Sequence, residues 1–557
     1  MIGQPSDNEL LFLPLGGCGE IGMNLNLYGH AGKWLMVDLG ITFGKETTPG
    51  IDIVMPDPSF IVERRQDLAG LVLTHAHEDH IGAVPYLWPK LRCPIYATPF
   101  TAAVLRRKLS EVNLLTEARI TEIPMSGRFS VGPFEIELIS ITHSIPEPNA
   151  VVIRTPLGAV LHTGDWKLDP DPVIGPITDV TALRRLGEEG VLAMICDSTN
   201  VLVEGSSGSE AEVRLSLDKL IGEYDQRIAV ACFASNVARI ESVTRAALAH
   251  GRHVGLVGRS LWRMVEAAQE TGYLTDLPDF VEEGDIGHLP RERVLMICTG
   301  SQGEPRSALA RIVRGEHADV TLEAGDAVIF SSRIIPGNEQ AIGELHNGLI
   351  HRGVKIVTER DHFIHVSGHP ARDDLADMYR WVNPKIAVPV HGELRHLRAH
   401  IELAQSCQVR QALLAANGTL IRLAPGPGEA VGEEPSGRLG LDGKILVPLD
   451  GAALKSRQRL AFNGAAVATL VLDGMGRLAG RPQVTIHGLA GEDSGDEAVI
   501  EAAAAAGKAV MVLSTAKRAE DATVREAARV AIRRALFAHF GKKPVTDVHL
   551  VRLPDIS

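Results

Sequence analysis

Short apolar runs separated by glycine and polar residues dominate the first part of the chain. Residues 34–37, 71–73 and 136–141 are runs of this kind, and a longer β-rich run covers 151–161. Their length and β-branched content are typical of buried strands, and the polar stretches between them leave room for helices and loops. The pattern predicts a layered α/β architecture from about residue 11 to residue 199.

A second pattern begins near residue 206 and ends near residue 350. Helical periodicity over 237–250 and 260–271 alternates with short apolar runs, which predicts a second α/β unit. The apolar runs are 228–233, 294–298 and 327–331.

The chain changes character again after residue 425. Residues 425–443 are rich in Gly and Pro and have the composition of a linker. Beyond about residue 455, strand-like runs and two helical stretches predict a small third domain. The strand-like runs are 465–472, 483–487 and 547–553, and the helical stretches are 497–506 and 521–539.

Composition supports a modular globular protein. A chain of 557 residues predicts two to four domains, and 45% apolar residues with only 4% aromatic residues require cores of Leu, Val, Ile and Ala. The net charge of -13 argues against a general surface for polyanions. Residues 206–351 hold 14 Lys and Arg against 21 Asp and Glu, so a nucleic-acid partner would need a local basic groove or bound cations.

The cysteines and the N-terminal segment bear on the cellular compartment. Six cysteines are scattered singly, with no CxxC pair, which fits a reducing cytosol. The first eleven residues lack a basic segment followed by an apolar one, and no run of about 18 apolar residues occurs. We therefore expect a cytoplasmic protein without a membrane partner.

The run Thr74-His75-Ala76-His77-Glu78-Asp79-His80 places four metal-binding side chains within six residues. It follows an apolar strand and precedes an amphipathic stretch, so the ligands lie on a strand-to-helix loop that can aim them at one point. Imidazole suits zinc and similar ions, and Asp79 adds a hard oxygen and negative charge. The motif predicts half of a two-metal hydrolytic site.

Further ligands are expected at other strand ends. His143, Asp165 and His391 each follow an apolar run, whereas His162 is expected to be structural. Because 226 positions separate Asp165 from His391, a whole domain must be inserted between two ligands of one site. The second α/β unit fills that gap and could cover a cleft suited to a polymer.

These residues resemble the metallo-β-lactamase fold, whose motif is His-x-His-x-Asp-His followed by single His, Asp and His ligands. The resemblance implies that His75, His77 and His143 hold one metal, that Asp79, His80 and His391 hold the other, and that Asp165 bridges them. It also implies that Asp38 orients the loop as a hydrogen-bond acceptor and does not itself bind metal. The implied cofactors are two divalent metal ions per subunit, with zinc first and manganese or magnesium as alternatives.

The large insertion resembles the β-CASP nucleases, and eight motifs resemble the ribonuclease J family over residues 10–425. The motifs are Gly16-Gly-Cys-Gly-Glu-Ile-Gly-Met-Asn24, His143-Ser-Ile-Pro146, Gly164-Asp-Trp-Lys167, Asp197-Ser-Thr-Asn200, Thr299-Gly-Ser-Gln-Gly-Glu-Pro305, Ser332-Arg-Ile-Ile-Pro-Gly-Asn-Glu339, His365-Val-Ser-Gly-His369 and Pro389-Val-His-Gly-Glu393. Met23 departs from the family pattern, which has Lys at this position.

The expected fold is an α/β metallo-β-lactamase αββα sandwich with an inserted α/β β-CASP domain and a small C-terminal α/β domain. The expected boundaries are 1–205 and 355–425 for the two parts of the sandwich, 206–354 for the insertion, 426–454 for a linker and 455–557 for the C-terminal domain.

The resemblance also implies roles for residues outside the metal set. Asp197 and His369 match the acid and histidine that protonate the leaving 3′ oxygen, and Asp79 joins them as a catalytic residue. A loop of small residues is expected to hold RNA phosphates, including a 5′-monophosphate. The substrate-binding residues are Ser332, Arg333, His365, Ser367, Gly368 and His369. Of four arginines considered for an RNA track, Arg239, Arg259, Arg306 and Arg333, only Arg333 is favoured.

The predicted function is metal-dependent hydrolysis of RNA, in which a hydroxide activated by two metals attacks phosphorus. The expected mode is 5′-to-3′ exonuclease action on 5′-monophosphate RNA, with endonuclease action as a second mode, in rRNA processing and mRNA decay. Expected partners are single-stranded RNA, a second copy in a homodimer or dimer of dimers, and an RNA decay complex. The alternatives are a small-molecule hydrolase of the same fold and a non-catalytic RNA-binding scaffold.

Overall fold

The computed structural model describes residues 4–45, 47–489 and 492–554, with the backbone alone at 492–495. The chain divides into two compact units. One consists of Met1–Thr42 and Met55–Gly437, and the other of Phe43–Val54 and Arg438–Ser557.

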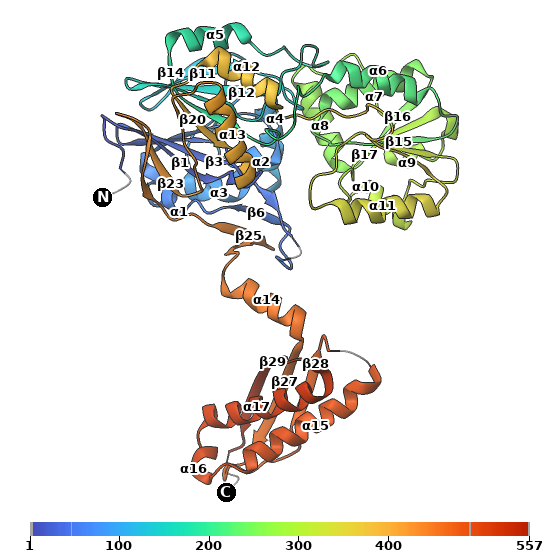
Figure 1. The fold of residues 1–557 in the computed structure, drawn as a ribbon. Helices are drawn as coiled ribbons and strands as arrows, with labels where there is room; N and C mark the ends of the chain where they lie inside the picture. Colours follow the sequence, from blue (N-terminus) through green and yellow to red (C-terminus); the bar gives the residue numbers. More distant parts are fainter. Residues whose placement is uncertain (1–3, 46, 490–491, 555–557) are drawn as a thin grey trace. The chain divides into compact units, whose positions relative to one another are not determined.

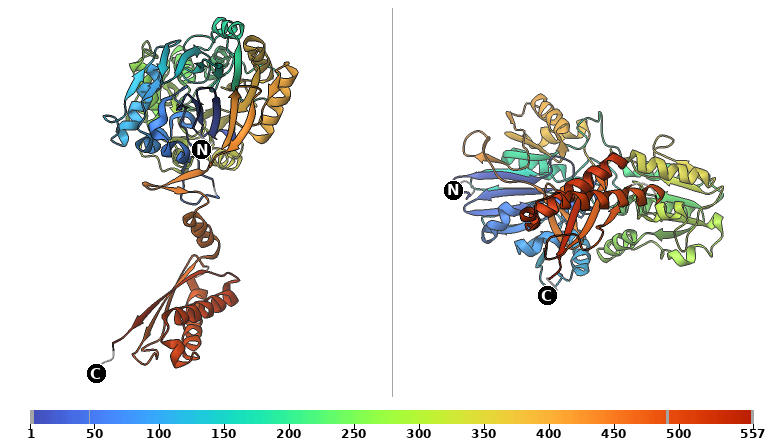
Figure 2. Two further views of the ribbon diagram at one scale, coloured as in Figure 1. Left: turned by 90° about the vertical axis from the view of Figure 1, so that its left-hand side faces the viewer. Right: turned by 90° about the horizontal axis from the view of Figure 1, so that it is seen from below.

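Two mixed sheets lie face to face in the first unit (Figures 1 and 2). The eight-stranded sheet has the order β24 (Glu429–Glu433), β23 (Thr419–Ala424), β1 (Leu10–Gly16), β3 (Leu25–His30), β4 (Lys33–Val37), β7 (Leu68–Val72), β8 (Ile95–Ala97) and β9 (Ile120–Glu122). The seven-stranded sheet has the order β10 (Arg128–Val131), β11 (Phe134–Ser140), β12 (Asn149–Thr155), β13 (Gly158–His162), β14 (Val191–Asp197), β20 (Ile386–Val390) and β22 (Gln411–Ala412).

The alternation of side chains along the strands creates an αββα sandwich. Leu35 and Val37 point into a core shared with the other sheet, whereas Trp34 points outward and packs edge-on against Phe60 of α1 (Ser59–Glu63). On the other side, α5 (Val180–Glu189), α12 (Arg372–Val382) and α13 (Leu394–Ser406) share a core with the outer face of the seven-stranded sheet. Helices α2 (Glu78–Ile81), α3 (Val84–Leu91) and α4 (Pro99–Glu111) follow strands β7 and β8.

One expected strand is divided in two. The apolar run 151–161 forms the antiparallel strands β12 and β13, in register from Val151 opposite His162 to Thr155 opposite Gly158. Pro156 has no backbone N–H for a ladder, and Gly158 takes a φ of 138°, so the run turns at this point. Periodicity alone could not show the turn because both strands are buried.

The inserted layer is a five-stranded parallel sheet with helices around it (Figure 1). Its order is β16 (His253–Val257), β17 (Val294–Cys298), β15 (Ile228–Ala231), β18 (Ala327–Phe330) and β19 (Lys355–Val357). Its helices are α6 (Glu210–Ile221), α7 (Val237–Ala249), α8 (Arg259–Glu270), α9 (Glu283–Ile286), α10 (Ala308–Arg314) and α11 (Glu339–His351).

The chain leaves the sandwich after β14 and returns to it as β20. These strands are parallel neighbours, with Asp197 opposite Val390, so the residues at their carboxyl ends lie together. The short parallel pair β2 (Cys18–Gly19) and β21 (Gly392–Glu393) joins the glycine-rich N-terminal motif to the same edge. The inserted layer thus interrupts the sequence between site residues without separating them in space.

The second unit ends in a three-stranded sheet with two long helices. In this sheet β27 (Ala465–Leu472) pairs antiparallel with β28 (Gln483–His487) and parallel with β29 (Val545–Arg552). Alternate residues of β27 are buried, and they share a core with α15 (Glu492–Met511) and α17 (Asp521–Phe540). Helices α14 (Ala452–Asn463) and α16 (Thr515–Arg518) complete this part.

The range 426–454, expected to be a linker, contains regular structure. It includes β24 and the antiparallel hairpin of β25 (Arg438–Asp442) and β26 (Ile445–Pro448). Gly443 lies at the hairpin turn with a φ of 61°. One of the glycines that suggest flexibility therefore serves a tight turn, and others lie within strands β24 and β25.

Candidate metal centre

Asp38, at the end of β4, holds the histidine-rich loop that follows β7. The two strands are parallel neighbours, so their carboxyl ends meet at one edge of the sheet. Asp38 has a φ of 64° and accepts hydrogen bonds from the backbone N–H and the hydroxyl of Thr74, each at 2.8 Å. Its Oδ2 also lies 2.7 Å from Nδ1 of His80. Asp38 therefore orients both the loop and His80, as expected from the sequence.

Three imidazoles and one carboxylate form a first cluster. Nδ1 of His77 lies 3.1 Å from Nε2 of His75 and 3.0 Å from Nε2 of His143. Oδ2 of Asp165 is 4.0 Å from Nε2 of both His75 and His143. The other ring nitrogen of His143 donates to the carbonyl of Gly368 at 2.5 Å, which leaves the Nε2 lone pair facing the cluster.

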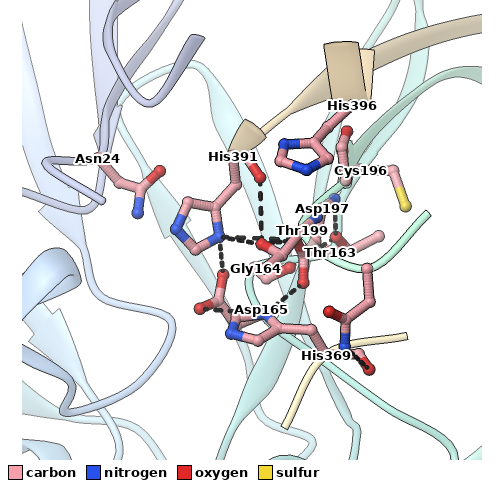
Figure 3. A network of polar contacts seen from close by, with 12 residues as sticks. Asn24, Thr163, Gly164, Asp165, Cys196, Asp197, Thr199, His369, His391 and His396 are labelled. Atoms are coloured by element: carbon pink, nitrogen blue, oxygen red, sulfur yellow. Dashed lines mark hydrogen bonds and ion pairs between the residues drawn. The ribbon is translucent and has the colours of Figure 1, made fainter. Parts of the chain in front are cut away.

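A second cluster shares Asp165 with the first. Nε2 of His80 lies 3.2 Å from Oδ2 of Asp165 and 3.7 Å from Oδ2 of Asp79. His391 reaches the same carboxylates, with Nδ1 2.8 Å from Oδ1 of Asp165 and Nε2 3.2 Å from Oδ2 of Asp79. Asp165 therefore belongs to both clusters, and Figure 3 shows its carboxylate facing His391.

The first cluster is electrically suited to bind a cation. Burial, reinforced by the neighbouring imidazoles, holds the pKa of His75 and of His143 well below its usual value. Burial also lowers the pKa of His77 to about 4. Neutral imidazoles offer lone pairs, and lone pairs that converge at about 3 Å repel one another unless a cation lies between them.

In the second cluster, the charge of the carboxylates outweighs the effect of burial on the histidines. Burial disfavours charge on His80 and His391, but the surrounding carboxylates outweigh it and raise the pKa of both well above the usual range. The same contacts outweigh burial at Asp79 and Asp165 and lower the pKa of both carboxyls. The carboxylates thus attract positive charge, which one divalent cation can supply while both imidazoles stay neutral as ligands.

Distances and hydrogen bonding agree that these residues fit metal ions. Zinc–nitrogen bonds of about 2.0–2.1 Å in a tetrahedron place neighbouring ligand nitrogens about 3.3 Å apart, close to the spacings in the first cluster. In the second cluster, the buried atoms Oδ1 of Asp165 and Nε2 of His391 lack a hydrogen-bonding partner with suitable angles among the described residues, despite their short contacts. Buried polar atoms without partners are costly and point to a ligand.

Asp197 and His369 form a pair beside the second cluster (Figure 3). Nδ1 of His369 lies 2.8 Å from Oδ2 of Asp197, and Oδ1 of Asp197 accepts hydrogen bonds from the N–H and hydroxyl of Thr199 at 2.9 and 2.7 Å. Burial opposes charge on both, but their mutual attraction lowers the pKa of Asp197 and raises that of His369. The pair therefore favours a carboxylate and an imidazolium that can donate from its other nitrogen.

The loop that carries His369 is held tightly against the first cluster. A Cβ on Gly368 would lie 2.7 Å from Cε1 of His143 and 2.9 Å from Oγ of Ser144, so only glycine fits there. The side chain of Ser367 is held in place because Nδ2 of Asn200 donates a hydrogen bond to its hydroxyl oxygen at 2.7 Å. The same amide donates to the carbonyl of His369 at 3.2 Å.

The remaining predicted substrate residues lie in a positive environment. Burial and the cations Arg239, Lys167 and Arg333 lower the pKa of His365 to about 3, and its buried Nδ1 has no hydrogen-bonding partner among the described residues. Ser332 is buried and Arg333 is exposed. Arg239 and Lys167 are ion-paired with Glu210 and Asp169, so the exposed guanidinium of Arg333 is the cation of the three that favours an anion here.

Four family descriptions match successive parts of the chain. They are "Beta-lactamase superfamily domain" over residues 47–183, "Ribonuclease J, beta-CASP domain" over 225–349, "Zn-dependent metallo-hydrolase RNA specificity domain" over 353–410 and "Ribonuclease J C-terminal domain" over 452–553.

Relatives of known name match over most of their length. A ribonuclease J of Sinorhizobium meliloti is 46% identical over 98% of this chain and 98% of its own length. The chain belongs to the ribonuclease J family. Ribonuclease J of Thermus thermophilus is 38% identical over 84% of this chain and 83% of its own length, and that of Helicobacter pylori is 35% identical over 96% and 78%.

Membership in the ribonuclease J family confirms the predicted enzyme class and fold. The chain is a metal-dependent ribonuclease with a metallo-β-lactamase domain, an inserted β-CASP domain and a C-terminal domain of this family. The two alternatives, a small-molecule hydrolase and a non-catalytic scaffold, are set aside. A crystal structure of a protein of unknown function from Enterococcus faecalis shares the fold, with a TM-score of 0.52, 15% identity and coverage of 74% of this chain and 100% of that one. No helix in the described part of the chain is long and apolar enough to cross a membrane.

Some supporting residues of this ribonuclease J family site escaped sequence reasoning. Nδ2 of Asn24 donates to the carbonyl of Asp79 at 3.1 Å and lies 3.2 Å from Nε2 of His80. Asn24 and Asn200 each end a motif that carries the family resemblance, but nothing in the motifs shows which atoms they would contact. The motifs therefore mark both asparagines as family residues but do not predict their contacts.

Two other residues have structural roles. Arg239, one of the arginines considered for an RNA track, is fully buried and forms an ion pair with Glu210, so it cannot face RNA. His162 lies 2.8 Å from the hydroxyl of buried Tyr28, and burial lowers its pKa to about 4. It packs behind the metal centre, in agreement with the structural role expected for it.

Proposed function

We propose that the chain degrades single-stranded RNA from a 5′-monophosphate end in the 5′-to-3′ direction and also cleaves internally. The observation that carries this proposal is the hydrogen bond from Nδ1 of His143 to the carbonyl of Gly368. We call residues 365–369 the phosphate loop. Because this contact holds the phosphate loop against a residue of the first metal cluster, RNA bound in the loop would present a phosphodiester to the cations. A free 5′ phosphate would be selected by the same positive environment.

The proposed ligands of one ion are His75, His77 and His143. Those of the other ion are Asp79, His80 and His391, and both ions share Asp165. Two divalent cations, with zinc favoured by the histidine content and manganese or magnesium as alternatives, would polarise phosphoryl oxygens and lower the pKa of a water molecule. The full set is His75, His77, His143, Asp79, His80, His391 and Asp165.

His369 is the proposed proton donor to the leaving 3′ oxygen. Its hydrogen-bonded partner Asp197 keeps the ring charged and fixes its orientation, and Thr199 in turn fixes Asp197. Positioned proton transfer contributes roughly 10²- to 10⁴-fold to a rate. Asp79 supports catalysis through the second cluster, where its carboxylate faces His391.

The proposed phosphate pocket combines the loop with an exposed guanidinium. Ser367, the backbone of Gly368 and the unpartnered Nδ1 of His365 offer polar contacts, and Arg333 with buried Ser332 approaches from the inserted layer. Arginine recognises phosphate in a two-pronged geometry, so we assign the 5′ phosphate to Arg333.

The finer biological setting is also proposed. We infer assembly into a homodimer or a dimer of dimers, participation in an RNA decay complex, and a role in rRNA processing and mRNA decay. Six cysteines without a disulfide among them support a cytoplasmic setting. We propose an insertion that begins at residue 206, as expected, and extends beyond the expected end at 354 to include β19, which pairs with β18.

The direct test is a time course on 3′-labelled single-stranded RNA that carries a 5′ monophosphate, triphosphate or hydroxyl. The proposal expects progressive loss of the monophosphate RNA, slower loss of the other two, sparing of a DNA oligonucleotide and no cleavage by His77→Ala. Equal rates on all three 5′ ends would overturn the phosphate-pocket assignment, and cleavage by His77→Ala would overturn the metal assignment.

A further inference from the structure

The C-terminal part of the chain differs in charge from the rest of the molecule. Residues 438–557 hold 17 Lys and Arg against 13 Asp and Glu, although the whole chain carries a net charge of -13. This local excess of positive charge contrasts with the acidic inserted domain. It shows that basic residues are concentrated away from the metal centre in the sequence.

Several of these cations meet at one pocket of about 480 Å³ within the second unit. Its basic lining comes from three separate segments, with Arg459 on α14, Arg529 and Arg533 on α17, and Lys543 between α17 and β29. Asn463 and Thr546 add polar side chains. Because the cations are up to 84 residues apart in sequence, no run of basic residues predicts the pocket.

Most of this charge is not neutralised within the described residues. Arg529 is paired with Glu526 at 2.6 and 2.7 Å. In contrast, Arg459 and Lys543 form no ion pair with another described side chain, and the buried Nε of Arg533 has no hydrogen-bonding partner there. Arg459 and Lys543 are exposed, so an incoming phosphate oxygen can pair with them without displacing another group.

Two exposed aromatic rings lie close to Lys543 of the pocket and to its chain neighbour Lys542. Nζ of Lys542 is 5.6 Å from the ring centre of Phe462, and Nζ of Lys543 is 5.1 Å from that of Phe537. Phe462 is 72% exposed and Phe537 is 46% exposed, so both side chains are accessible from solvent. Cations that follow a phosphate backbone beside aromatic rings that stack on bases are characteristic of surfaces for single-stranded nucleic acid.

We propose that this basic pocket is a second RNA-binding site that holds the phosphate backbone of single-stranded RNA, with Phe462 stacking on a base. The inference rests on the proposed action on RNA. It assigns to the C-terminal domain a role in retaining the substrate. An acidic surface of a second copy of this chain is the alternative occupant, and sedimentation distinguishes it from RNA.

The test measures the binding of a labelled single-stranded RNA to the full-length His77→Ala protein in chelator, so that cleavage does not interfere. The variant Arg459→Ser/Lys543→Ser removes two cations from the pocket. The matched control, Arg477→Ser/Lys508→Ser, removes two exposed cations of the same unit that do not line it. Cation removal should lower the slope of log affinity against log salt by about 0.7 per contact, and hence by about 1.4 for the pocket variant.

The expected affinity loss in 0.1 M salt is on the order of tenfold for the pocket variant, with little change for the control. Phe462→Ala should weaken binding about fivefold or more without changing the salt slope, since stacking releases no counterions. Equal affinity and slope for pocket variant and control would overturn the proposal. So would a change in sedimentation behaviour with unchanged RNA affinity, which would assign the pocket to a contact between copies.

These outcomes are separable from a failure of the proposed function. If the native protein cleaves 5′-monophosphate RNA while the pocket variant binds RNA like its control, only the second site is wrong. If the native protein fails to cleave RNA but the pocket variant shows the expected loss of affinity, the second site stands without the proposed catalytic mode.

Discussion

Oδ2 of Asp38 lies 2.7 Å from Nδ1 of His80, so a carboxylate at the end of one strand fixes the orientation of a proposed metal ligand on the next strand's loop. Both residues are almost completely buried. A histidine that donates one ring N–H to a carboxylate presents the other nitrogen to a metal with increased basicity. The metal centre therefore depends on a residue that does not itself bind metal.

Replacing Asp38 with Asn tests this dependence. Asn tolerates the positive φ of 64° and keeps the shape of the side chain, but it removes the negative charge behind His80. We expect metal affinity to fall about 10- to 100-fold, as for other residues that support ligands. The measurement is metal content after dialysis against graded chelator, with exposed Asp7→Asn as the control. Equal retention in both variants would show that Asp38 has no such role.

Gly368→Ala tests the close contact between the phosphate loop and His143. The added methyl group would lie 2.7 Å from Cε1 of His143, so either the ring or the loop must move. We expect RNA cleavage to fall about 100-fold, since a misplacement of about 1 Å can cost that much. Gly343→Ala is the matched control, because its Cβ meets nothing within 4 Å in helix α11. Retention of full activity by Gly368→Ala would contradict the tight placement of the loop.

Arg239 on α7 contacts both loops that carry proposed phosphate-binding residues. Its guanidinium pairs with Glu210 at 2.9 Å and donates to the carbonyls of Ser331 and Ile364 at 2.9 and 3.0 Å. These carbonyls directly precede Ser332 and His365 in the chain. Arg239 thus acts as a positioning residue for the proposed phosphate contacts.

Arg239→Met should lower stability by about 3–5 kcal/mol because Glu210 is left buried and unpaired. The double variant Arg239→Met/Glu210→Met should recover much of that stability, yet its preference for a 5′ monophosphate should stay reduced. Calorimetry and the RNA time course measure the two effects, and Arg245→Met on the surface should change stability by less than about 1 kcal/mol. A double variant with full 5′ preference would refute the positioning role.

His400 predicts a pH dependence of stability. It is fully buried, with Nδ1 2.9 Å from the hydroxyl of Ser198 and Nε2 2.9 Å from that of Tyr379, and burial lowers its pKa to about 4. The unfolded chain, with a histidine pKa of about 6.5, takes up the proton first as pH falls. The contribution of neutral His400 is therefore complete above about pH 6.5 and is lost as pH falls toward 4, by up to about 3 kcal/mol.

The difference between wild type and His400→Gln isolates this contribution. Melting temperatures measured from pH 8 to pH 4 should fall less steeply with acidification in His400→Gln, whereas exposed His288→Gln should follow the wild type. Parallel curves for wild type and His400→Gln would mean that His400 does not control this part of the pH profile.

The metal-cluster residues could be predicted because their signal is local. Dense His and Asp residues at strand ends can be recognised one segment at a time, and parallel neighbours bring strand ends together. The buried pair of Arg239 and Glu210 could not be predicted, because an arginine of an acidic domain looks like a surface residue until its partners are known. The basic pocket around Arg459 and Lys543 was missed for the same reason.

The central claim is that Asp165 joins two cation sites. The most direct test counts zinc or manganese ions per chain by native mass spectrometry, in wild type and in Asp165→Asn, alongside RNA cleavage. We predict two ions per wild-type chain, cleavage that requires both, and weakened binding at both sites in Asp165→Asn. A single ion in the fully active wild type, or two tightly held ions in Asp165→Asn, would contradict the account.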